Sequence, residues 1–470
     1  MNFLDDFDKV FEGINMTETI AAAATPGVPS AIGILRLSGP RAREIASAVF
    51  TPMGGGVLAD KPARKLIYGT LKDQNGTAID QVLATWSPGP NSYTGEDTAE
   101  LQCHGSPAVL ALGLEALFAH GARQALAGEF TRRAFLNGRM DLAQAEAVID
   151  LIDAETAESA RNAYGQLNGA LSRRVDTIYD GLTDVMAHFH AVLDYPDEDI
   201  APFTESTIRD ALTEALSRLD ALLATYDRGS LLAEGVPCAI VGRPNVGKSS
   251  LLNALLGYDR AIVTNIPGTT RDTLEERLRL GGILLRLVDT AGMRHTDDAV
   301  ERMGVDRSRS ALERARLALL VLDGGQPLTD EDEQAIAAAQ NAPNLICVVN
   351  KSDLDPVLDV EQLRRRFDKI CLVSAATGDG LQELEQIITS CFPSGGDEVG
   401  SLLTNARQAE AAKRARASVI SALDGLDMGV TPDALLTDAE QAMIALGELT
   451  GRSVREDITD RIFSRFCVGK

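Results

Sequence analysis

Short apolar runs separated by turn residues fill the first third of the chain. Runs with the length of single strands lie at residues 31–37, 66–71 and 79–86. The sequence Pro-Gly-Pro-Asn-Ser at 88–92 then interrupts the pattern. These features predict a β-rich α+β domain over residues 17–135. Residues 1–16 have apolar positions at helical spacing, but Met16 is an equally good initiator, so they are either an extension or a misassigned start.

Beyond this region the apolar residues recur every three or four positions among good helix formers, mainly Ala, Leu, Glu, Gln and Arg. We expect helices over residues 136–230 and again over 393–470, where Thr404–Leu423 and Asp438–Phe466 have this pattern. Each half is short for an independent bundle. The two halves are therefore expected to pack together as one all-α domain.

Between these halves, residues 231–392 alternate strand patterns with helical ones. Val236–Val241 and Leu345–Val349 are continuous apolar runs, as expected of buried strands. The alternation predicts a parallel sheet with crossover helices, inserted into the helical domain.

Composition narrows the class of protein. A length of 470 residues corresponds to about three domains. The formal net charge of −23 argues against a general nucleic-acid coat protein. The six cysteines have no zinc-binding spacing, and no apolar run is long enough to cross a bilayer. We therefore expect a cytoplasmic protein with reduced thiols and no membrane contact.

The sequence Gly-Arg-Pro-Asn-Val-Gly-Lys-Ser at 242–249 fits the phosphate-binding pattern GxxxxGK[ST] and stands between a predicted strand and a predicted helix. Its glycines let successive N–H groups point at one anion, and the helix adds its positive N-terminal end. Lys248 is expected to reach the β- and γ-phosphates, and Ser249 to ligate Mg²⁺. The other expected nucleotide contacts of this segment are Asn245, Val246, Gly247 and Ser250.

A second motif predicts which base is bound. Asn350, Lys351 and Asp353 follow a predicted strand, and ligands of open α/β sheets bind where strands end. An ionised aspartate only accepts hydrogen bonds, so Asp353 suits the N1 and N2 donors of guanine, whereas adenine has an acceptor at N1. GTP is therefore favoured over ATP. The Lys351 stem is expected to cover the base, and Asn350 to tie this loop to the phosphate loop.

Three further segments stand in the order expected of a GTPase. They are Thr269-Thr270 in a switch segment, with Thr270 offered to Mg²⁺; Asp289-Thr290-Ala291-Gly292 near the metal and the γ-phosphate; and Ser374-Ala375-Ala376 beside the base. The position directly after Gly292 is Met293, whose thioether is too weak an acceptor to hold the attacking water.

These residues resemble the translation-factor-related class of GTPases, and the chain from Thr17 to Lys470 resembles the tRNA-modification GTPase family called MnmE or TrmE. Outside the GTPase motifs, the resemblance depends on Gly33-Ile34-Leu35-Arg36, on PGPNSYTGED at 88–97, on FLN at 135–137, on DLAQAEA at 141–147 and on FCVGK at 466–470. It implies a P-loop GTPase domain inserted in the helical domain, with a folate-binding domain before both.

The resemblance also implies how hydrolysis is completed. In this family the GTPase domains are thought to dimerise across GTP, with a potassium ion in place of an arginine finger. Lys248 and Glu301 would be the catalytic residues, with Glu301 positioning water, whereas the residues alone favour a solvated helix charge for Glu301. The implied potassium ligands are Asn245, Thr264, the carbonyl of Ile266, and Thr269.

For the first domain, the resemblance implies binding of 5-formyl- or 5,10-methylene-tetrahydrofolate. The implied contacts are Arg36, Glu100, Arg139 and Lys470, although the family often has lysine at the Arg139 position. Cys467 is either a nucleophile or base partner near that site, or a structural residue at a helix end.

The implied function is that of a homodimer working with the flavoprotein MnmG (GidA), as a heterotetramer, on tRNA. Together they would add a carboxymethylaminomethyl or aminomethyl group at C5 of the wobble uridine. FAD would belong to the partner, because this chain has no second glycine-rich nucleotide motif. The alternatives are a GTPase that assembles ribosomal RNA, which would need a basic flanking module, and a signalling switch without a part in chemistry.

Overall fold

The computed structural model describes residues 17–194, 205–262, 276–288, 312–392, 398–430 and 432–452, together with Cys467 and Gly469. Contacts divide the chain into two compact units. The first comprises Met1–Ile152, Tyr164–Ala221 and Glu410–Lys470, and the second comprises Asp153–Ala163 and Leu222–Ala409.

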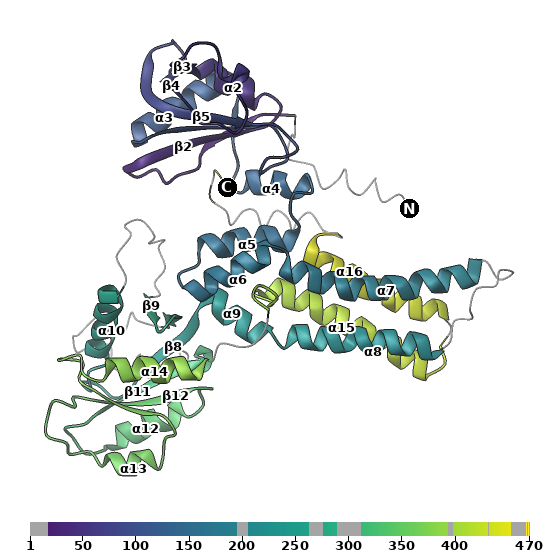
Figure 1. The fold of residues 1–470 in the computed structure, drawn as a ribbon. Coiled ribbons are helices and arrows are strands. Elements are labelled where there is room, and N and C mark those ends of the chain that lie inside the picture. Colours follow the sequence, from purple (N-terminus) through teal and green to yellow (C-terminus); the bar gives the residue numbers. More distant parts are fainter. Residues whose placement is uncertain are drawn as a thin grey trace. The chain divides into compact units, whose positions relative to one another are not determined.

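A seven-stranded sheet forms the N-terminal part of the first unit (Figure 1). Its strands lie in the order β3-β4-β5-β6-β2-β1-β7, and neighbours pair antiparallel except β1 with β7. The strands are β1 (Ile20–Ala23), β2 (Ser30–Ser38), β3 (Phe50–Pro52), β4 (Ile67–Lys72), β5 (Ala78–Ser87), β6 (Thr98–Gly105) and β7 (Arg123–Gln124). The predicted β-rich α+β fold of this region is confirmed.

Helices α2 (Ala42–Val49) and α3 (Pro107–Ala119) bury one face of this sheet. Strand side chains alternate between faces, so Leu35 and Leu101 point into this core and are fully buried. Arg36 and Glu100 lie between such core positions and therefore project from the opposite face. The pattern of burial thus leaves two charged residues on the face that the helices do not cover.

An ion-pair network crosses the start of helix α4 (Glu129–Leu136). Arg133 is fully buried and donates to Glu129 at 2.9 Å and to Glu96 at 3.0 Å, while Arg123 lies 2.7 Å from Glu129. Burial alone would raise the pKa of Glu129, but the hydrogen bonds and ion pairs with Arg123, Arg133 and the Leu126 N–H hold it below its ordinary value. Glu129 is therefore ionised in the folded protein.

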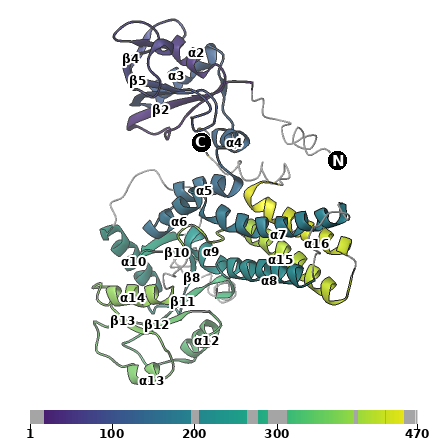
Figure 2. The ribbon, with the colours of Figure 1, turned by 45° about the vertical axis from the view of Figure 1, so that its right-hand side comes forward.

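Four long helices of the first unit lie side by side in both views (Figures 1 and 2). They are α7 (Ala170–Asp194), α8 (Glu205–Leu223), α15 (Ala406–Asp427) and α16 (Pro432–Thr450), and they follow the shorter α5 (Leu142–Ile152) and α6 (Ala157–Leu167). Helix α16 packs against α7 and α5, and Arg416 of α15 pairs with Asp220 of α8. Segments before and after residues 231–392 therefore share one core.

The helix expected over Asp438–Phe466 is wrong in its bounds. Helix α16 begins earlier, at Pro432, and ends at Thr450. Gly451 has a φ of +86°, and both Gly451 and Arg452 donate to the carbonyl of Gly447. This left-handed glycine closes the helix, since its missing Cβ makes that conformation cheap. Residues 453–466 lie outside the described ranges.

The second unit contains a six-stranded sheet in the order β13-β12-β11-β8-β10-β9. Its strands and helices are α9 (Tyr226–Glu234), β8 (Val236–Val241), α10 (Lys248–Ile262), β9 (Glu276–Leu280), β10 (Ile283–Leu287), β11 (Leu317–Asp323), α12 (Asp330–Ala339), β12 (Leu345–Asn350), α13 (Val360–Arg364), β13 (Ile370–Val373) and α14 (Leu381–Cys391). Five strands pair in parallel, as predicted, but β9 is antiparallel to β10. Gly281 and Gly282 both have positive φ and allow this tight hairpin.

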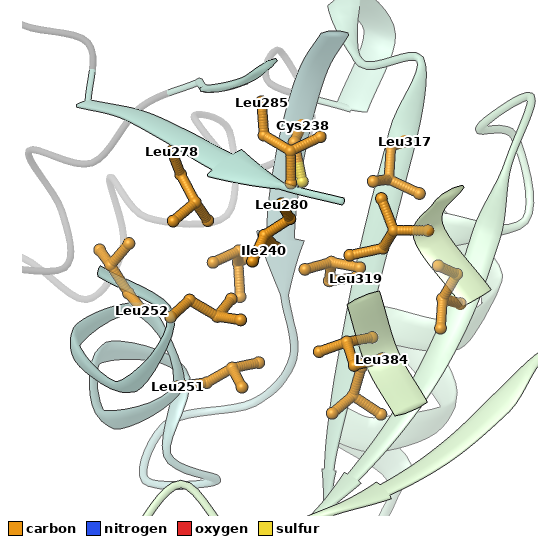
Figure 3. Close-up of a cluster of buried hydrophobic side chains, with 14 of the residues drawn as sticks. Cys238, Ile240, Leu251, Leu252, Leu278, Leu280, Leu285, Leu317, Leu319 and Leu384 are labelled. Carbon is orange, nitrogen blue, oxygen red and sulfur yellow. The ribbon is translucent and has the colours of Figure 1, made fainter. Parts of the chain in front are cut away.

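Helices cover both faces of this sheet. Cys238 and Ile240 of β8 point into a cluster with Leu251 of α10 and Leu384 of α14 (Figure 3). The alternate residues of β8 face a second cluster, which includes Ile336 of α12. Because both faces are filled, the sheet can bind a ligand only at the ends of its strands.

Candidate functional site

The loops after β8, β11, β12 and β13 follow the carboxyl ends of parallel strands. Asp323 of β11 pairs in register with Asn350 of β12, which in turn pairs with Val373 of β13. The predicted phosphate loop follows β8 on the other side of β11. The fold thus brings the two predicted nucleotide-binding loops to the same edge of the sheet.

Two glycines of the phosphate loop occupy positions that admit no side chain. Gly242 has a φ of +150°, and a Cβ there would lie 2.3 Å from the carbonyl oxygen of Val321. Gly247 has a φ of +97°, and its Cβ would lie 2.2 Å from Nδ2 of Asn350. The loop therefore passes close to β11 and β12 because glycine is present at both turns.

Lys248, the first residue of α10, bonds back to its own loop. Its Nζ donates to the carbonyl oxygens of Gly242 at 2.7 Å and Arg243 at 2.8 Å. Burial lowers the pKa of this ammonium. A phosphate could accept from the same three N–H donors and would favour the charged form of the ammonium. Lys248 is therefore placed to replace its bonds to the two carbonyl oxygens by bonds to a phosphate.

The neighbouring loop residues differ in exposure. Asn245 is exposed with a φ of +64°, whereas Val246 is fully buried in the sheet core, so its side chain anchors the loop and leaves only its backbone for a ligand. Ser249 is half-buried and Ser250 is exposed in the first turn of α10. Their N–H groups belong to the positive end of that helix.

Asn350 joins three segments. Its Nδ2 donates to the carbonyl of Val246 at 2.9 Å, and its Oδ1 accepts from the N–H of Ala375 at 3.0 Å. The side chain is only 2% exposed. Asn350 therefore fixes the phosphate loop, its own loop and the loop after β13 relative to one another. The predicted contact of Asn350 with the phosphate loop is confirmed.

Asp353 lies at the surface beside that junction. Ser374 Oγ donates to its Oδ1 at 2.6 Å, and the Thr377 N–H donates to Ser374 Oγ at 3.2 Å. Asp353 itself is exposed, as is Ala376. The bond from Ser374 thus orients the carboxylate through Oδ1, and Oδ2 can accept from an N–H donor of a nucleotide base.

The other predicted residues of this site lie outside the described residues. They are Thr264, Ile266, Thr269, Thr270, Asp289, Thr290, Ala291, Gly292 and Glu301. Their roles stay predictions.

In the first unit, the residues expected at the folate site fall into two groups. Arg36 Nε lies 2.8 Å from Glu100 Oε1 across β2 and β6, and both residues line a cavity of about 260 Å³. Tyr93, Thr94, Thr98 and Phe130 also line it. Arg139 is exposed and is not among the lining residues, although its Cγ lies close to Gly95.

The C-terminal segment reaches this part of the molecule. The carbonyl of Cys467 accepts from the Gly128 N–H at 3.5 Å, and the carbonyl of Gly469 accepts from Arg36 Nη1 at 3.4 Å. Gly469 is buried with a φ of +103°, and a Cβ there would lie 2.3 Å from the carbonyl oxygen of Ala23. Cys467 is exposed and its role stays open, and Lys470 lies outside the described residues.

Sequence reasoning missed two buried carboxylates that bond to the cations of the nucleotide site. Asp323 pairs with Lys351, and Asp332 pairs with Arg243 of the phosphate loop at 3.0 Å. Asp323 ends a buried apolar run at 317–322, which was a signal that could have pointed to it. Asp332 is the third helical residue of α12, where its capping-box pattern with Thr329 was also readable.

Helices cover both faces of a largely parallel sheet, and a glycine-dependent phosphate loop at its edge bonds to the loop that contains Asp353. This arrangement is that of the class of P-loop guanine-nucleotide-binding proteins.

Comparison with known proteins extends this assignment. Residues 19–139 match the model of the GTP-binding protein TrmE N-terminus, and residues 142–467 match that of the MnmE helical domain. The tRNA modification GTPase MnmE of Roseiflexus sp. (strain RS-1) is 46% identical over 466 residues, with 96% of this chain and 99% of that protein covered. The same protein of Heliobacterium modesticaldum is 46% identical over 465 residues, with the same coverage. Among solved structures, the G domain of the T. maritima FeoB iron transporter matches 34% of this chain and 99% of its own, at 26% identity and a TM-score of 0.25.

The chain belongs to the MnmE family of tRNA modification GTPases. The family resemblance expected from the motifs is therefore confirmed, and the chain is a GTPase. Within the part of the chain that the structure describes, no helix combines the length and apolar character needed to span a bilayer.

Proposed function

We propose that this chain hydrolyses GTP in the cytoplasm to drive tRNA modification. With a flavoprotein partner of the MnmG (GidA) type, which carries FAD, it would add a carboxymethylaminomethyl or aminomethyl group at C5 of the wobble uridine. A tetrahydrofolate derivative would supply the carbon. The observation that carries the nucleotide part is the bonding of Asn350 to both the phosphate loop and the loop after β13. Family membership supports the tRNA part.

The choice of guanine depends on Asp353. Its carboxylate is oriented by Ser374 and exposed, so one oxygen is available to the N1 and N2 donors of guanine. Adenine has no such pair of donors. A charge-assisted hydrogen bond contributes on the order of 1.5–3 kcal/mol, which corresponds to roughly 10- to 150-fold discrimination.

For hydrolysis, Lys248 would hold the β- and γ-phosphates, and Ser249 with Thr270 would ligate Mg²⁺. The Ser249 hydroxyl stands next to Lys248 at the start of α10, and hydroxyl oxygens are suitable ligands for this ion. Bound metal offsets the charge that develops on the transferred phosphoryl group. Asn245, Thr264, Ile266 and Thr269 are the proposed potassium ligands, and Glu301 would position water. Of these five residues only Asn245 is described, and its exposed amide oxygen suits the ion.

Arg36 and Glu100 fit part of a folate. Glu100 can accept from the N–H donors of the amino-pyrimidinone edge, and Arg36 beside it can donate to an oxygen or nitrogen of the same ring system. The cavity of about 260 Å³ is below the ~300–1,000 Å³ typical of sites for whole drug-sized ligands, so it matches the ring system better than the complete cofactor. Arg139 and Lys470 are proposed to contact the remainder. The homodimer and the heterotetramer with the flavoprotein are part of the same proposal.

Nucleoside analysis of bulk tRNA tests the function. Cells that lack this chain should lose the modified wobble uridine, and wild-type protein should restore it. Lys248→Ala protein should fail to restore it although it is expressed at the same level. Intact modification in the deleted cells would contradict the proposed function.

Nucleotide binding tests the base assignment separately. Asp353→Asn should lose affinity for GTP and gain affinity for XTP, because xanthine has a C2 carbonyl that accepts from the new amide. Thr377→Ala, four residues beyond β13 and exposed, is the matched control and should keep the GTP preference. Unchanged GTP preference in Asp353→Asn would reject the assignment.

A further inference from the structure

We propose that Asp323 is a positioning residue for nucleotide binding. It holds the Lys351 side chain in the conformation in which the methylene stem covers the face of the guanine ring. This inference rests on the proposed binding of GTP. Asp323 acts, through Lys351, on the contact with the face of the base, whereas Asp353 bonds to the edge of the base.

Asp323 is a buried carboxylate with both oxygens occupied. It is the last residue of β11, and its side chain is 3% exposed. Oδ2 accepts from Lys351 Nζ at 2.6 Å, and Oδ1 accepts from the Gly325 N–H at 3.0 Å. A buried charge without a partner is strongly unfavourable, so Asp323 is matched to one cation and one backbone donor.

Lys351 is held at both ends of its side chain. Its backbone has a φ of +66°, a conformation that a non-glycine residue adopts only when its surroundings impose it. Its Nζ also donates to the carbonyl of Asn245 at 3.2 Å. The ammonium is therefore fixed between β11 and the phosphate loop, and the methylene stem must run from one nucleotide loop to the other. About a third of the side chain, 34%, remains exposed for contact with a base.

The backbone around this pair is also fixed. The Gly324 N–H donates to the carbonyl of Asn350 at 2.8 Å, and a Cβ on Gly324 would lie 3.0 Å from that same oxygen. The chain therefore turns from β11 toward the loop that contains Lys351 directly after Asp323. The carboxylate itself cannot turn away from Lys351 without losing its bond from the Gly325 N–H.

The structure supplies a matched control in Asp332. It is also buried, at 2% exposed, and pairs with a cation of the same site, Arg243 of the phosphate loop, through Nε at 3.0 Å. Its partner lies in the phosphate loop and not beneath the base. Loss of the Asp332 carboxylate would loosen the phosphate loop without changing the conformation of the Lys351 side chain.

The test is a double-mutant cycle on the full chain, with dissociation constants for GTP and ITP as readouts. ITP lacks the 2-amino group but has the same ring face, so loss of the Lys351 platform should weaken both nucleotides equally. Asp323→Asn and Lys351→Met should each weaken them by about tenfold, and the double variant should be no weaker than Lys351→Met alone. Asp332→Asn combined with Lys351→Met should instead give additive losses.

Additive losses in the Asp323 cycle, or a Lys351→Met variant that binds both nucleotides as tightly as the wild type, would overturn the inference. If Asp323→Asn does not fold, Asp323→Ser takes its place in the same cycle, because it also removes the carboxylate that pairs with Lys351. Failure of the GTP assignment would show differently, as unchanged base preference in Asp353→Asn.

Discussion

The nucleotide site and the N-terminal cavity each depend on a basic side chain, but the chain builds them in different ways. Lys248 donates to carbonyls five and six residues before it. Arg36 bonds to Glu100, 64 residues away, and to the carbonyl of Gly469, 433 residues away. One contiguous loop supplies most of the first arrangement, whereas the second exists only after the sheet and the C-terminal segment have come together.

This difference predicts different sensitivities. The nucleotide loops are fixed by contacts between the ends of neighbouring strands, such as those of Asn350 with Val246 and Ala375, so they should respond mainly to changes at those strand ends. The cavity depends on the register of β2 against β6 and on the ion pairs behind it, so substitutions that never touch a ligand should damage it. Three variants test the contrast, beginning with the largest expected effect.

Glu129→Gln should be the most damaging, because it leaves Arg123 and Arg133 without their shared carboxylate. Breaking a buried ion pair costs about 3–5 kcal/mol. Trp86 is the only tryptophan and lies on β5, so its fluorescence during denaturant unfolding reports on this sheet. The variant should unfold at lower denaturant and lose folate binding, while its affinity for GTP stays that of the wild type.

The same variant has a pH signature. The folded pKa of Glu129 is lowered, so its contribution to stability is complete above the unfolded value of about 4.3 and is lost as the pH falls through the lower folded value. The stability difference between wild type and variant should be largest near neutral pH and shrink below about pH 4. A difference that is constant with pH would show that the ionised carboxylate is not what stabilises this region.

Gly247→Ala should affect only the nucleotide site. The new Cβ would meet Asn350 Nδ2 at 2.2 Å, and the φ of +97° is unfavourable for alanine. Affinity for GTP should fall by at least about a hundredfold, roughly 2.7 kcal/mol. The control is Gly257→Ala in α10, where a Cβ meets nothing within 4 Å and alanine is the better helix former. Equal GTP affinity in both variants would contradict the account of the loop.

The sequence also predicts the nucleotide site better than it predicts the N-terminal cavity. Val236–Val241 is a strand with the predicted bounds, because a buried run between a helix and a glycine turn has few alternatives. The contact of Asn350 with the phosphate loop was expected from motif order. The ion pair of Glu96 with Arg133 could not be predicted, because a single charged residue does not indicate which distant residue it will contact. Arg36 and Glu100 were placed together only by family resemblance.

Arg36→Ala should have the smallest effect of the three and sharpens the contrast most. The pair with Glu100 is half-buried, with side chains 23% and 29% exposed, so its loss should weaken binding of 5-formyl-tetrahydrofolate by about tenfold, near 1.4 kcal/mol, in isothermal titration calorimetry. GTP affinity should not change. His104→Gln on β6, the strand of Glu100, is the control that should keep folate affinity, because its ring is 74% exposed and pairs with Asp80. Wild-type folate binding by Arg36→Ala would mean that the cavity is not the folate site, and the long-range contacts of Arg36 would then serve only to hold the C-terminal segment against the sheet.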